Sequence, residues 1–259
     1  MLDRIKSRWY FQPDYERDLF LASFPRSGNT WLRAFFFWLE SGAFPVSLRE
    51  IDYLVIDQHY QIAKHKAKRV NTYSVVKTHS PCLRRPRRYI YVVRNPVESI
   101  ISFYMYNKNT QSNFGIPLDE FAYAVLNGQV WPCSWAEHVR SWLGSQGSSH
   151  LISDHVIRYE DLISNDIEKL NECLLKILLF YPDINLDAAR TAIRSLDRKK
   201  MKQLEIAGNR PCLERIRSDW FVFGSYAGSK DEARQIVARV IHKHGYDTLR
   251  LCRHFQYLA

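Results

Sequence analysis

The sequence predicts an α/β protein in which a central parallel sheet is covered by helices on both faces. Short apolar runs with the character of buried strands recur along the chain. Segments with helical signals follow these runs, so that strands and helices alternate. The runs are almost uniformly apolar, as expected of strands that are covered on two faces. No repeat, long linker or low-complexity segment interrupts the pattern, and we therefore expect one domain that spans residues 1–259.

Four segments carry the strand signal: residues 18–24, 73–78, 89–93 and 155–158. They combine β-branched, aromatic and other apolar residues, which favour extended structure. The first segment ends in Pro-Arg-Ser-Gly, which indicates a tight turn. Residues 29–40 follow as a predicted buried helix that ends near Gly42. The N-terminal part of the chain is therefore predicted to run from a strand through a tight turn into a helix.

Capping residues mark two further helix starts. Asn95 is a suitable N-cap, Pro96 suits the first helical position, and Glu98 stands where a capping box needs an acidic residue. Ser134 and Glu137 repeat this pattern before a helix that runs to about residue 143. An amphipathic pattern predicts a helix at residues 166–180, and two more helices are predicted at residues 186–194 and 229–244, the last of which ends at Gly245.

Composition narrows the class of protein. Of the 259 residues, 46% are hydrophobic, which is enough for a buried core. The net charge of +10 favours anionic partners, and basic clusters lie at residues 64–69, 84–88 and 198–202, although each cluster also suits an ordinary solvated surface. Five cysteines without a C-x-x-C spacing argue against a disulfide framework or a zinc site. Because the sequence shows no apolar leader and no apolar stretch of spanning length, we expect a cytoplasmic protein with no membrane span.

Residues 23–31, which read S-F-P-R-S-G-N-T-W, carry the features of an anion-binding turn. Gly28 lets backbone N–H groups converge on an anion, and the start of the helix adds the positive end of its dipole. The turn lacks the second glycine and the Lys-Ser/Thr pair of a Walker A motif, which argues against a nucleoside-triphosphate hydrolase. By itself the pattern fits either a phosphate-binding loop or an ordinary strand-to-helix turn. The turn also offers one fixed positive charge and three side-chain donors: Arg26, Ser27, Asn29 and Thr30.

The same segment resembles the 5′-phosphosulfate loop of sulfotransferases that depend on 3′-phosphoadenosine 5′-phosphosulfate (PAPS), a loop that typically reads (T/S)-(Y/F)-P-K-(S/A)-G-x-T-W. Arg26 stands where lysine is usual, which keeps the charge but presents a planar fork in place of a point charge. Residues 89–104 resemble the 3′-phosphate segment of that family, with Arg94 and Ser102 at its eight-residue spacing.

Two more segments carry the resemblance. Residues 76–81, V-K-T-H-S-P, resemble the K-T-H-x-P segment of the family, in which the histidine, here His79, is the catalytic base. Residues 156–162, V-I-R-Y-E-D-L, resemble the segment whose tyrosine, here Tyr159, contacts adenine. The four matches occur in the family's order between residues 18 and 162, more than half of the chain.

The resemblance implies a P-loop-like sulfotransferase fold and transfer of a sulfuryl group from PAPS to a hydroxyl group, which leaves the desulfated nucleotide PAP. His79 would take the proton of the acceptor as general base, while Arg26 and Lys77 would stabilise the transfer. Trp31 and Tyr159 would contact the adenine. The reaction requires no metal ion. The residues that would hold PAPS in this part of the chain are Arg26, Ser27, Gly28, Asn29, Thr30, Trp31, Arg94, Ser102 and Tyr159.

The last third of the chain matches the family less well. Ser195, followed by Met201 and Lys202, loosely resembles its S-F-x-x-M-K segment on the adenine side. The R-K-G-x-x-G-x-W loop, which clamps the 3′-phosphate in the family, has no clear equivalent between residues 215 and 226. Arg215 and Arg217 are candidates to replace that clamp from a shifted position.

Two other functions compete with this interpretation. A nucleotide or small-molecule kinase would use the same architecture, but the loop lacks the residues that bind Mg-ATP. A basic nucleic-acid-binding protein would suit the net charge, but no recognition motif is evident, so we expect no nucleic-acid partner. We expect a small-molecule acceptor, aromatic or amphipathic, held by residues 42–70 and 104–150, in which aromatic residues are frequent. A monomer or a homodimer fits the sequence equally well.

Overall fold

The computed structural model describes residues 13–59, 73–111, 114–144, 155–207 and 229–257. In these residues, five strands form one parallel sheet in the order β2-β3-β1-β4-β5. The strands are β1 (Leu19–Ser23), β2 (Val55–Asp57), β3 (Val75–Thr78), β4 (Arg88–Val93) and β5 (Val156–Arg158). The predicted α/β class with a parallel sheet is therefore confirmed.

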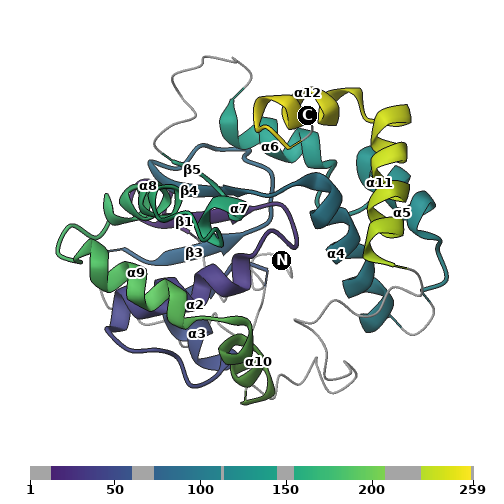
Figure 1. Ribbon diagram of the computed structural model, residues 1–259. Coiled ribbons are helices and arrows are strands. Elements are labelled where there is room, and N and C mark those ends of the chain that lie inside the picture. The colour runs from purple at the N-terminus through teal and green to yellow at the C-terminus, as the bar shows by residue number, and fades with distance from the viewer. Residues whose placement is uncertain (1–12, 60–72, 112–113, 145–154, 208–228, 258–259) are drawn as a thin grey trace, which may run out of the picture.

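Helices cover both faces of the sheet (Figure 1). On one face pack α2 (Asn29–Ser41), α3 (Leu48–Leu54), α8 (Ile167–Leu178), α9 (Leu186–Ser195) and α10 (Arg198–Ala207). On the other face pack α4 (Pro96–Thr110), α5 (Leu118–Leu126), α6 (Trp135–Leu143), α11 (Lys230–His244) and α12 (Tyr246–His254). The short helix α7 (Tyr159–Leu162) follows β5 directly.

Strand β1 shows why its residues form a buried central strand. Leu19 and Leu21 enter one hydrophobic cluster, while Phe20 and Ala22 enter the cluster on the opposite face. All four side chains are buried, because successive residues of a strand point to opposite faces and both faces are covered. This accounts for the nearly uninterrupted apolar run in the sequence.

Most of the predicted elements are confirmed to within about two residues, but several were missed. Strand β2 and helix α3 lie in a stretch that was predicted only to hold the acceptor, and helices α5, α7, α10 and α12 were not predicted. In the described residues no helix has both the length and the apolar character needed to cross a bilayer.

The two predicted capping boxes had different outcomes. The box at Ser134 and Glu137 is present, with both of its hydrogen bonds formed. Asn95 caps α4 as predicted, since its side chain accepts a hydrogen bond from the N–H of Val97. The prediction for Glu98 was wrong: the backbone N–H of Asn95 donates to Glu160 instead, and the Glu98 carboxylate lies 2.6 Å from the Arg234 side chain on α11.

Candidate active site

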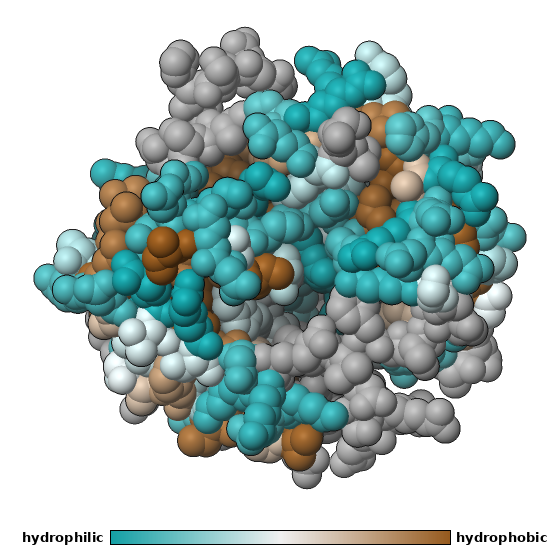
Figure 2. All heavy atoms as spheres, viewed as in Figure 1, coloured by the Kyte–Doolittle hydropathy of each residue, from teal (hydrophilic) through white to brown (hydrophobic). Residues whose placement is uncertain are grey.

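A cavity of about 620 Å³ opens at the edge of the sheet where the strands have their carboxyl ends. Its wall includes the β1–α2 turn, the residue after β3, the start of the segment after β4, helix α4 and the α7–α9 side of the molecule. In the space-filling view the same face is hollowed near its centre, with mostly hydrophilic surface around the hollow (Figure 2). The predicted site residues in the wall are Arg26, Gly28, Asn29, Thr30, Trp31, His79, Arg94, Ser102 and Tyr159.

The β1–α2 turn has an unusual backbone. Arg26 has φ 66° and Gly28 has φ 84°, so two of three successive residues lie in the left-handed region. A Cβ atom on Gly28 would lie 2.3 Å from a ring carbon of Tyr159, which leaves room only for glycine. Ser27 is fully buried and its Oγ has no hydrogen-bond partner. The turn therefore delivers the N-terminus of the 13-residue helix α2 to the cavity with a buried hydroxyl donor beside it.

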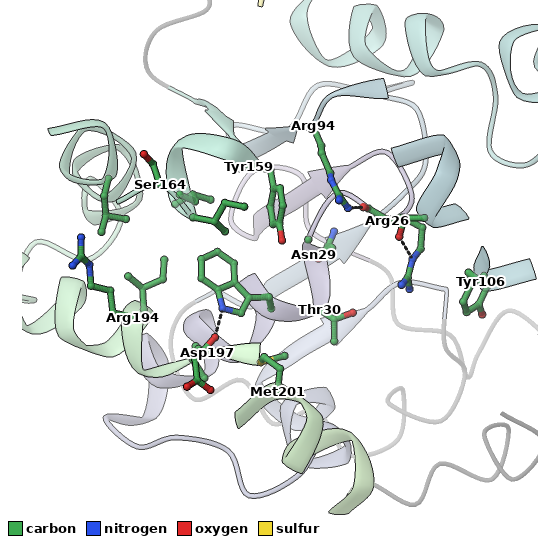
Figure 3. Close-up of a pocket in the computed structure, with 18 of the residues that line it drawn as sticks. Arg26, Asn29, Thr30, Arg94, Tyr106, Tyr159, Ser164, Arg194, Asp197 and Met201 are labelled. Atoms are coloured by element: carbon green, nitrogen blue, oxygen red, sulfur yellow. Dashed lines mark hydrogen bonds between the residues drawn. The ribbon is translucent and has the colours of Figure 1, made fainter. Parts of the chain in front are cut away.

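Two arginines from different segments meet at this turn (Figure 3). Arg94, directly after β4, donates from Nη1 to the carbonyl oxygen of Arg26 at 2.6 Å, and its guanidinium lies 4.8 Å from the centre of the Tyr159 ring. Arg26 donates from Nε to Ser102 Oγ at 3.2 Å and lies over the ring of Tyr106. The structure thus brings the predicted Arg94–Ser102 pair to the same cavity as the turn and concentrates positive charge there.

Aromatic side chains form another part of the wall. Trp31 and Tyr159 meet edge to face, with ring centres 6.3 Å apart, and Trp31 Nε1 donates to the carbonyl oxygen of Leu196 at 2.6 Å. Ser195 is exposed and does not line the cavity; its hydroxyl donates to the carbonyl oxygen of Thr191. Its neighbours Arg194 and Asp197 do line the cavity, although the sequence motif singled out neither.

Hydrogen bonds determine the chemical state of His79. Its Nδ1 lies 2.7 Å from the carbonyl oxygen of Ser23, which can only accept, so Nδ1 carries the proton. Its backbone N–H donates to Nε2 of His59 at 3.0 Å, and its carbonyl oxygen lies 3.0 Å from Nε2 of His138. Nε2 of His79 is therefore the nitrogen that can accept a proton from a ligand.

Burial lowers the pKa of His79 well below 6.5, and the nearby Lys77 ammonium group lowers it further. The hydrogen bond to Ser23 and the charge of Asp57 act in the opposite direction without reversing the shift. The imidazole is therefore neutral near neutral pH, which is the state a general base needs.

Lys77 lies in a buried charge cluster and does not line the cavity. Its Nζ is 3.2 Å from the carboxylate of Asp57 at the end of β2, and Arg33 of α2 lies 3.6 Å from the same carboxylate. Burial alone would raise the pKa of Asp57, but Lys77 and Arg33 hold it well below its ordinary value. The Lys77 ammonium group is thus close enough to His79 to affect its charge while it is paired with Asp57.

The sequence motifs did not reveal two aromatic side chains beside His79. His59 stacks on it with ring centres 6.2 Å apart, and Trp131, which is 53% exposed, meets both imidazoles edge to face. The only signal for either residue was its place in a segment predicted to hold the acceptor, residues 42–70 for His59 and residues 104–150 for Trp131. The two remaining predicted residues, Arg215 and Arg217, lie outside the described residues.

Within the described ranges, no three His, Cys, Asp or Glu side chains gather in a group that could hold a metal ion. The four cysteines in those ranges are free thiols.

Comparison with known proteins gives one family. A model of the sulfotransferase domain matches residues 16–219. Human sulfotransferase 4A1 is 24% identical over 172 residues, which cover 62% of this chain and 59% of that protein. A 3-alpha-hydroxysteroid sulfotransferase from Cavia porcellus is 26% identical over 181 residues, which cover 63% of this chain and 60% of that protein. The chain thus matches about three fifths of the length of these curated relatives.

Solved structures share the fold. A mouse sulfotransferase complexed with PAP superposes with a TM-score of 0.58 at 20% identity, over 96% of this chain and 91% of that chain. A retinol dehydratase in a complex with retinol and PAP superposes with a TM-score of 0.53 at 16% identity, over 92% of this chain and 86% of that chain.

Proposed function

The chain belongs to the sulfotransferase domain family, and on that premise we propose that it transfers a sulfuryl group from PAPS to a hydroxyl group of a small-molecule acceptor. One observation carries the proposal: a single cavity reaches the β1–α2 turn, Arg94, Ser102 and His79. PAPS has a 3′-phosphate and a 5′-phosphosulfate on one adenosine. It needs two separate anion-binding positions and, for transfer, a base within reach of the acceptor.

We assign the parts of the nucleotide by the chemistry of the wall. The N-terminus of α2 and Thr30 would hold the 5′-phosphate. Ser27 is fully buried and does not line the cavity, so its contact with the phosphate stays a prediction. Arg94 and Ser102 would hold the 3′-phosphate. The edge-to-face pair of Trp31 and Tyr159 would border the adenine.

The proposed chemistry uses His79 and Arg26. Nε2 of His79 takes the proton of the acceptor hydroxyl as the new oxygen–sulfur bond forms. The bond between sulfur and the 5′-phosphate oxygen breaks, and the departing PAP keeps its electron pair. Arg26 offers a fixed positive charge to the oxygen on which negative charge grows.

For Lys77 the structure supports an electrostatic role. Its ammonium group is paired with Asp57 and lowers the pKa of His79. The charge of Lys77 therefore keeps the proposed base in the form that can accept a proton.

We propose that the acceptor lies beside His59, Trp131 and Tyr106. The rings of His59 and Trp131 contact the His79 ring, and the ring of Tyr106 lies against the Arg26 guanidinium. Such a wall suits an aromatic or amphipathic alcohol. The retinol dehydratase of similar fold, which is bound to retinol in its structure, supports the same class of acceptor.

Several other properties stay predictions. They are a single domain over residues 1–259, a cytoplasmic location, a monomer or a homodimer, a reaction without a metal ion, and no nucleic-acid partner. Arg215 and Arg217 stay candidates for the second half of the 3′-phosphate site.

Ligand-dependent melting tests the proposal against its competitors. We expect PAP to raise the melting temperature, and Mg-ATP and duplex DNA to leave it nearly unchanged, since only a ligand of the folded state stabilises it. A rise with Mg-ATP alone would favour a kinase, and a rise with DNA alone would favour a nucleic-acid-binding protein. Transfer of labelled sulfate from PAPS to a panel of phenols, alcohols, sugars and amines then tests the activity and finds the acceptor.

The 3′-phosphate assignment has its own test. Wild-type protein is expected to bind PAP more tightly than AMP, which lacks the 3′-phosphate. Arg94→Gln should reduce that preference by about tenfold to hundredfold in calorimetry, because a charge-assisted hydrogen bond contributes about 1.5–3 kcal/mol. Arg239→Gln, which changes an exposed arginine on α11, is the matched control. An unchanged preference in Arg94→Gln would refute the assignment.

A further inference from the structure

Helix α6 presents three side chains to the segment that carries His79. Nε2 of His138 lies 3.0 Å from the carbonyl oxygen of His79, and Trp142 Nε1 donates to the carbonyl oxygen of Ser80 at 3.0 Å. Ser141 Oγ accepts from the backbone N–H of Cys82 at 2.9 Å. Positions 138, 141 and 142 share one face of a helix because they are three or four residues apart. The backbone of residues 79–82, which follow β3, is thus linked to α6 by hydrogen bonds to side chains of that helix.

The hydrogen bonds of His138 define its tautomer. A carbonyl oxygen can only accept, so Nε2 of His138 carries the proton that it donates to His79. Nδ1 is then the acceptor for the hydroxyl group of Tyr91, which lies 2.9 Å away. His138 is fully buried, and burial lowers its pKa to about 4, so the ring is neutral under ordinary conditions.

These contacts continue to the proposed base. Three polar groups of His79 are already held: its N–H by His59, its carbonyl oxygen by His138, and its Nδ1–H by Ser23. The fourth, Nε2, is the atom assigned to the acceptor proton. Because the position of an imidazole follows the position of its backbone, the bond from His138 acts together with those from His59 and Ser23 to place Nε2 in the cavity.

We propose that His138 is a positioning residue for sulfuryl transfer, which acts through the carbonyl oxygen of His79 and itself contacts neither donor nor acceptor. His138 is absent from the described wall of the cavity, and its side chain lies among Tyr91, Phe24 and the backbone of residues 79–80. The proposal rests on the proposed function, because it takes the base role of His79 as given.

Paired substitutions separate positioning from packing. His138→Met removes the N–H donor and keeps most of the volume, whereas His138→Gln keeps an N–H donor near the place of Nε2. We expect His138→Met to lower kcat by about tenfold to hundredfold, with the affinity for PAP changed less than about twofold, and His138→Gln to recover most of kcat. Ser141→Ala, which removes the anchor of Cys82 on the same helix, is the matched control and should change kcat less than about threefold.

Each result bears on the proposal. Equal and near-wild-type kcat in both His138 variants would overturn it. Equal losses of kcat and of PAP affinity in both variants would also overturn it, since they would indicate a structural role. If His138→Met does not fold, Tyr91→Phe provides a second variant, because it removes only the hydroxyl that orients Nδ1 and should lower kcat without changing the affinity for PAP.

A measurement without substrate keeps this proposal separate from the proposed function. ¹H–¹⁵N spectra of the histidine rings report the Nδ1–H group of His79, which donates to the carbonyl oxygen of Ser23. If the bond from His138 holds the backbone of His79 in place, its loss should move the ring and weaken that hydrogen bond. We therefore expect slow exchange of this proton with solvent in the wild type and in His138→Gln, and faster exchange in His138→Met. If the wild type transferred no sulfate, the proposed function would fail, while faster exchange in His138→Met alone would still support positioning; an unchanged exchange rate would overturn it.

Discussion

His79 is a residue whose neighbours determine both its charge and its tautomer. Burial and Lys77 lower its pKa, and the carbonyl oxygen of Ser23 holds the proton on Nδ1. We expect His79→Ala to lower the rate of sulfate transfer by about 10²–10⁴-fold, the usual contribution of a general base. The affinity for PAP should stay within about twofold of wild type, because the phosphate contacts assigned to other residues are kept. Labelled-sulfate transfer and calorimetry measure the two quantities.

The control for this prediction is His242→Ala, which removes an exposed histidine from α11 and should behave as wild type. The lowered pKa also implies that the wild-type rate persists as the pH falls through 6.5. A near-wild-type rate in His79→Ala would remove this residue from the mechanism.

The buried charges of Lys77, Asp57 and Arg33 support a second prediction at this scale. Asp57→Asn leaves the buried Lys77 ammonium group without the carboxylate it pairs with, whereas Arg33 keeps its ion pair with Asp52, and we expect it to lower the free energy of unfolding by about 3–5 kcal/mol. Lys77→Met should lower the free energy of unfolding by less than Asp57→Asn does, because the positive charge of Arg33 still lies beside the Asp57 carboxylate. It should also move the acid limb of the rate profile to higher pH, since a cation that lowers the pKa of His79 is gone. Urea unfolding tests the two stabilities, and pH–rate profiles test the shift of the acid limb. A larger loss of stability in Lys77→Met than in Asp57→Asn, or an unmoved acid limb, would contradict the prediction.

At the scale of elements, the β1–α2 turn depends on one glycine. Gly28→Ala places a residue at φ 84° and a Cβ atom 2.3 Å from the ring of Tyr159. Strain at a positive φ costs about 1 kcal/mol, and displacement of Tyr159 adds to that cost and moves a wall of the cavity. We therefore expect a lower melting temperature and a loss of PAP affinity of tenfold or more, on the order of 1.4 kcal/mol.

Gly42→Ala provides a control on the same helix. Gly42 ends α2 at φ 72°, but a Cβ atom there would meet nothing within 4 Å. This variant should show the backbone strain without any effect on PAP affinity. Equal losses of affinity in the two variants would mean that the close approach of Tyr159 to the turn is unimportant.

Strong local signals explain which elements the sequence predicted. The helix that starts at Asn95 and the helix that starts at Ser134 have capping residues that act within one turn. Strand β2 has three residues, too few to show a period, and only its pairing with β3 identifies it. Helices α5 and α12 start after Pro117 and Gly245 without a side-chain N-cap, so no capping signal marks their first turn. Glu98 does not cap the helix because its carboxylate accepts a hydrogen bond from Arg234, which lies 136 positions away in the sequence.

At the scale of the whole molecule, the topology assembles a site from separate motifs. Parallel strands have their carboxyl ends at one edge, so the residues after β1, β3 and β4 meet there although each motif was recognised alone. The contacts that adjust the site were not predictable in this way. Asp57, at the end of the edge strand β2, pairs with Lys77 of β3, and His59 accepts from the backbone N–H of His79. His138 on α6 bonds to His79, which lies 59 positions earlier in the sequence. Such pairs depend on register and helix packing, which the motifs do not contain.

The stability of the whole fold carries the last prediction, because His138 is buried in its neutral form. Its pKa is about 4 in the folded protein, and the ordinary value of 6.5 applies after unfolding. Between these values the unfolded chain binds a proton that the folded chain does not, so stability is lost as the pH falls from 6.5 toward 4. A shift of this size corresponds to about 3 kcal/mol when complete, at about 1.4 kcal/mol for each pH unit. His79 adds a loss of the same sign.

Urea unfolding at pH 7.5 and pH 4.5 measures this loss. The wild type should lose about 2–3 kcal/mol more than His138→Gln between the two conditions, since glutamine does not titrate. His242→Ala should keep the wild-type loss, because that histidine is exposed and its removal leaves the buried ring in place. Comparing the change with pH, and not the stability at one pH, removes the cost of the substitution itself. Parallel pH dependence in the wild type and His138→Gln would show that His138 is not held neutral by the fold, and the hydrogen bond to His79 would then need another explanation.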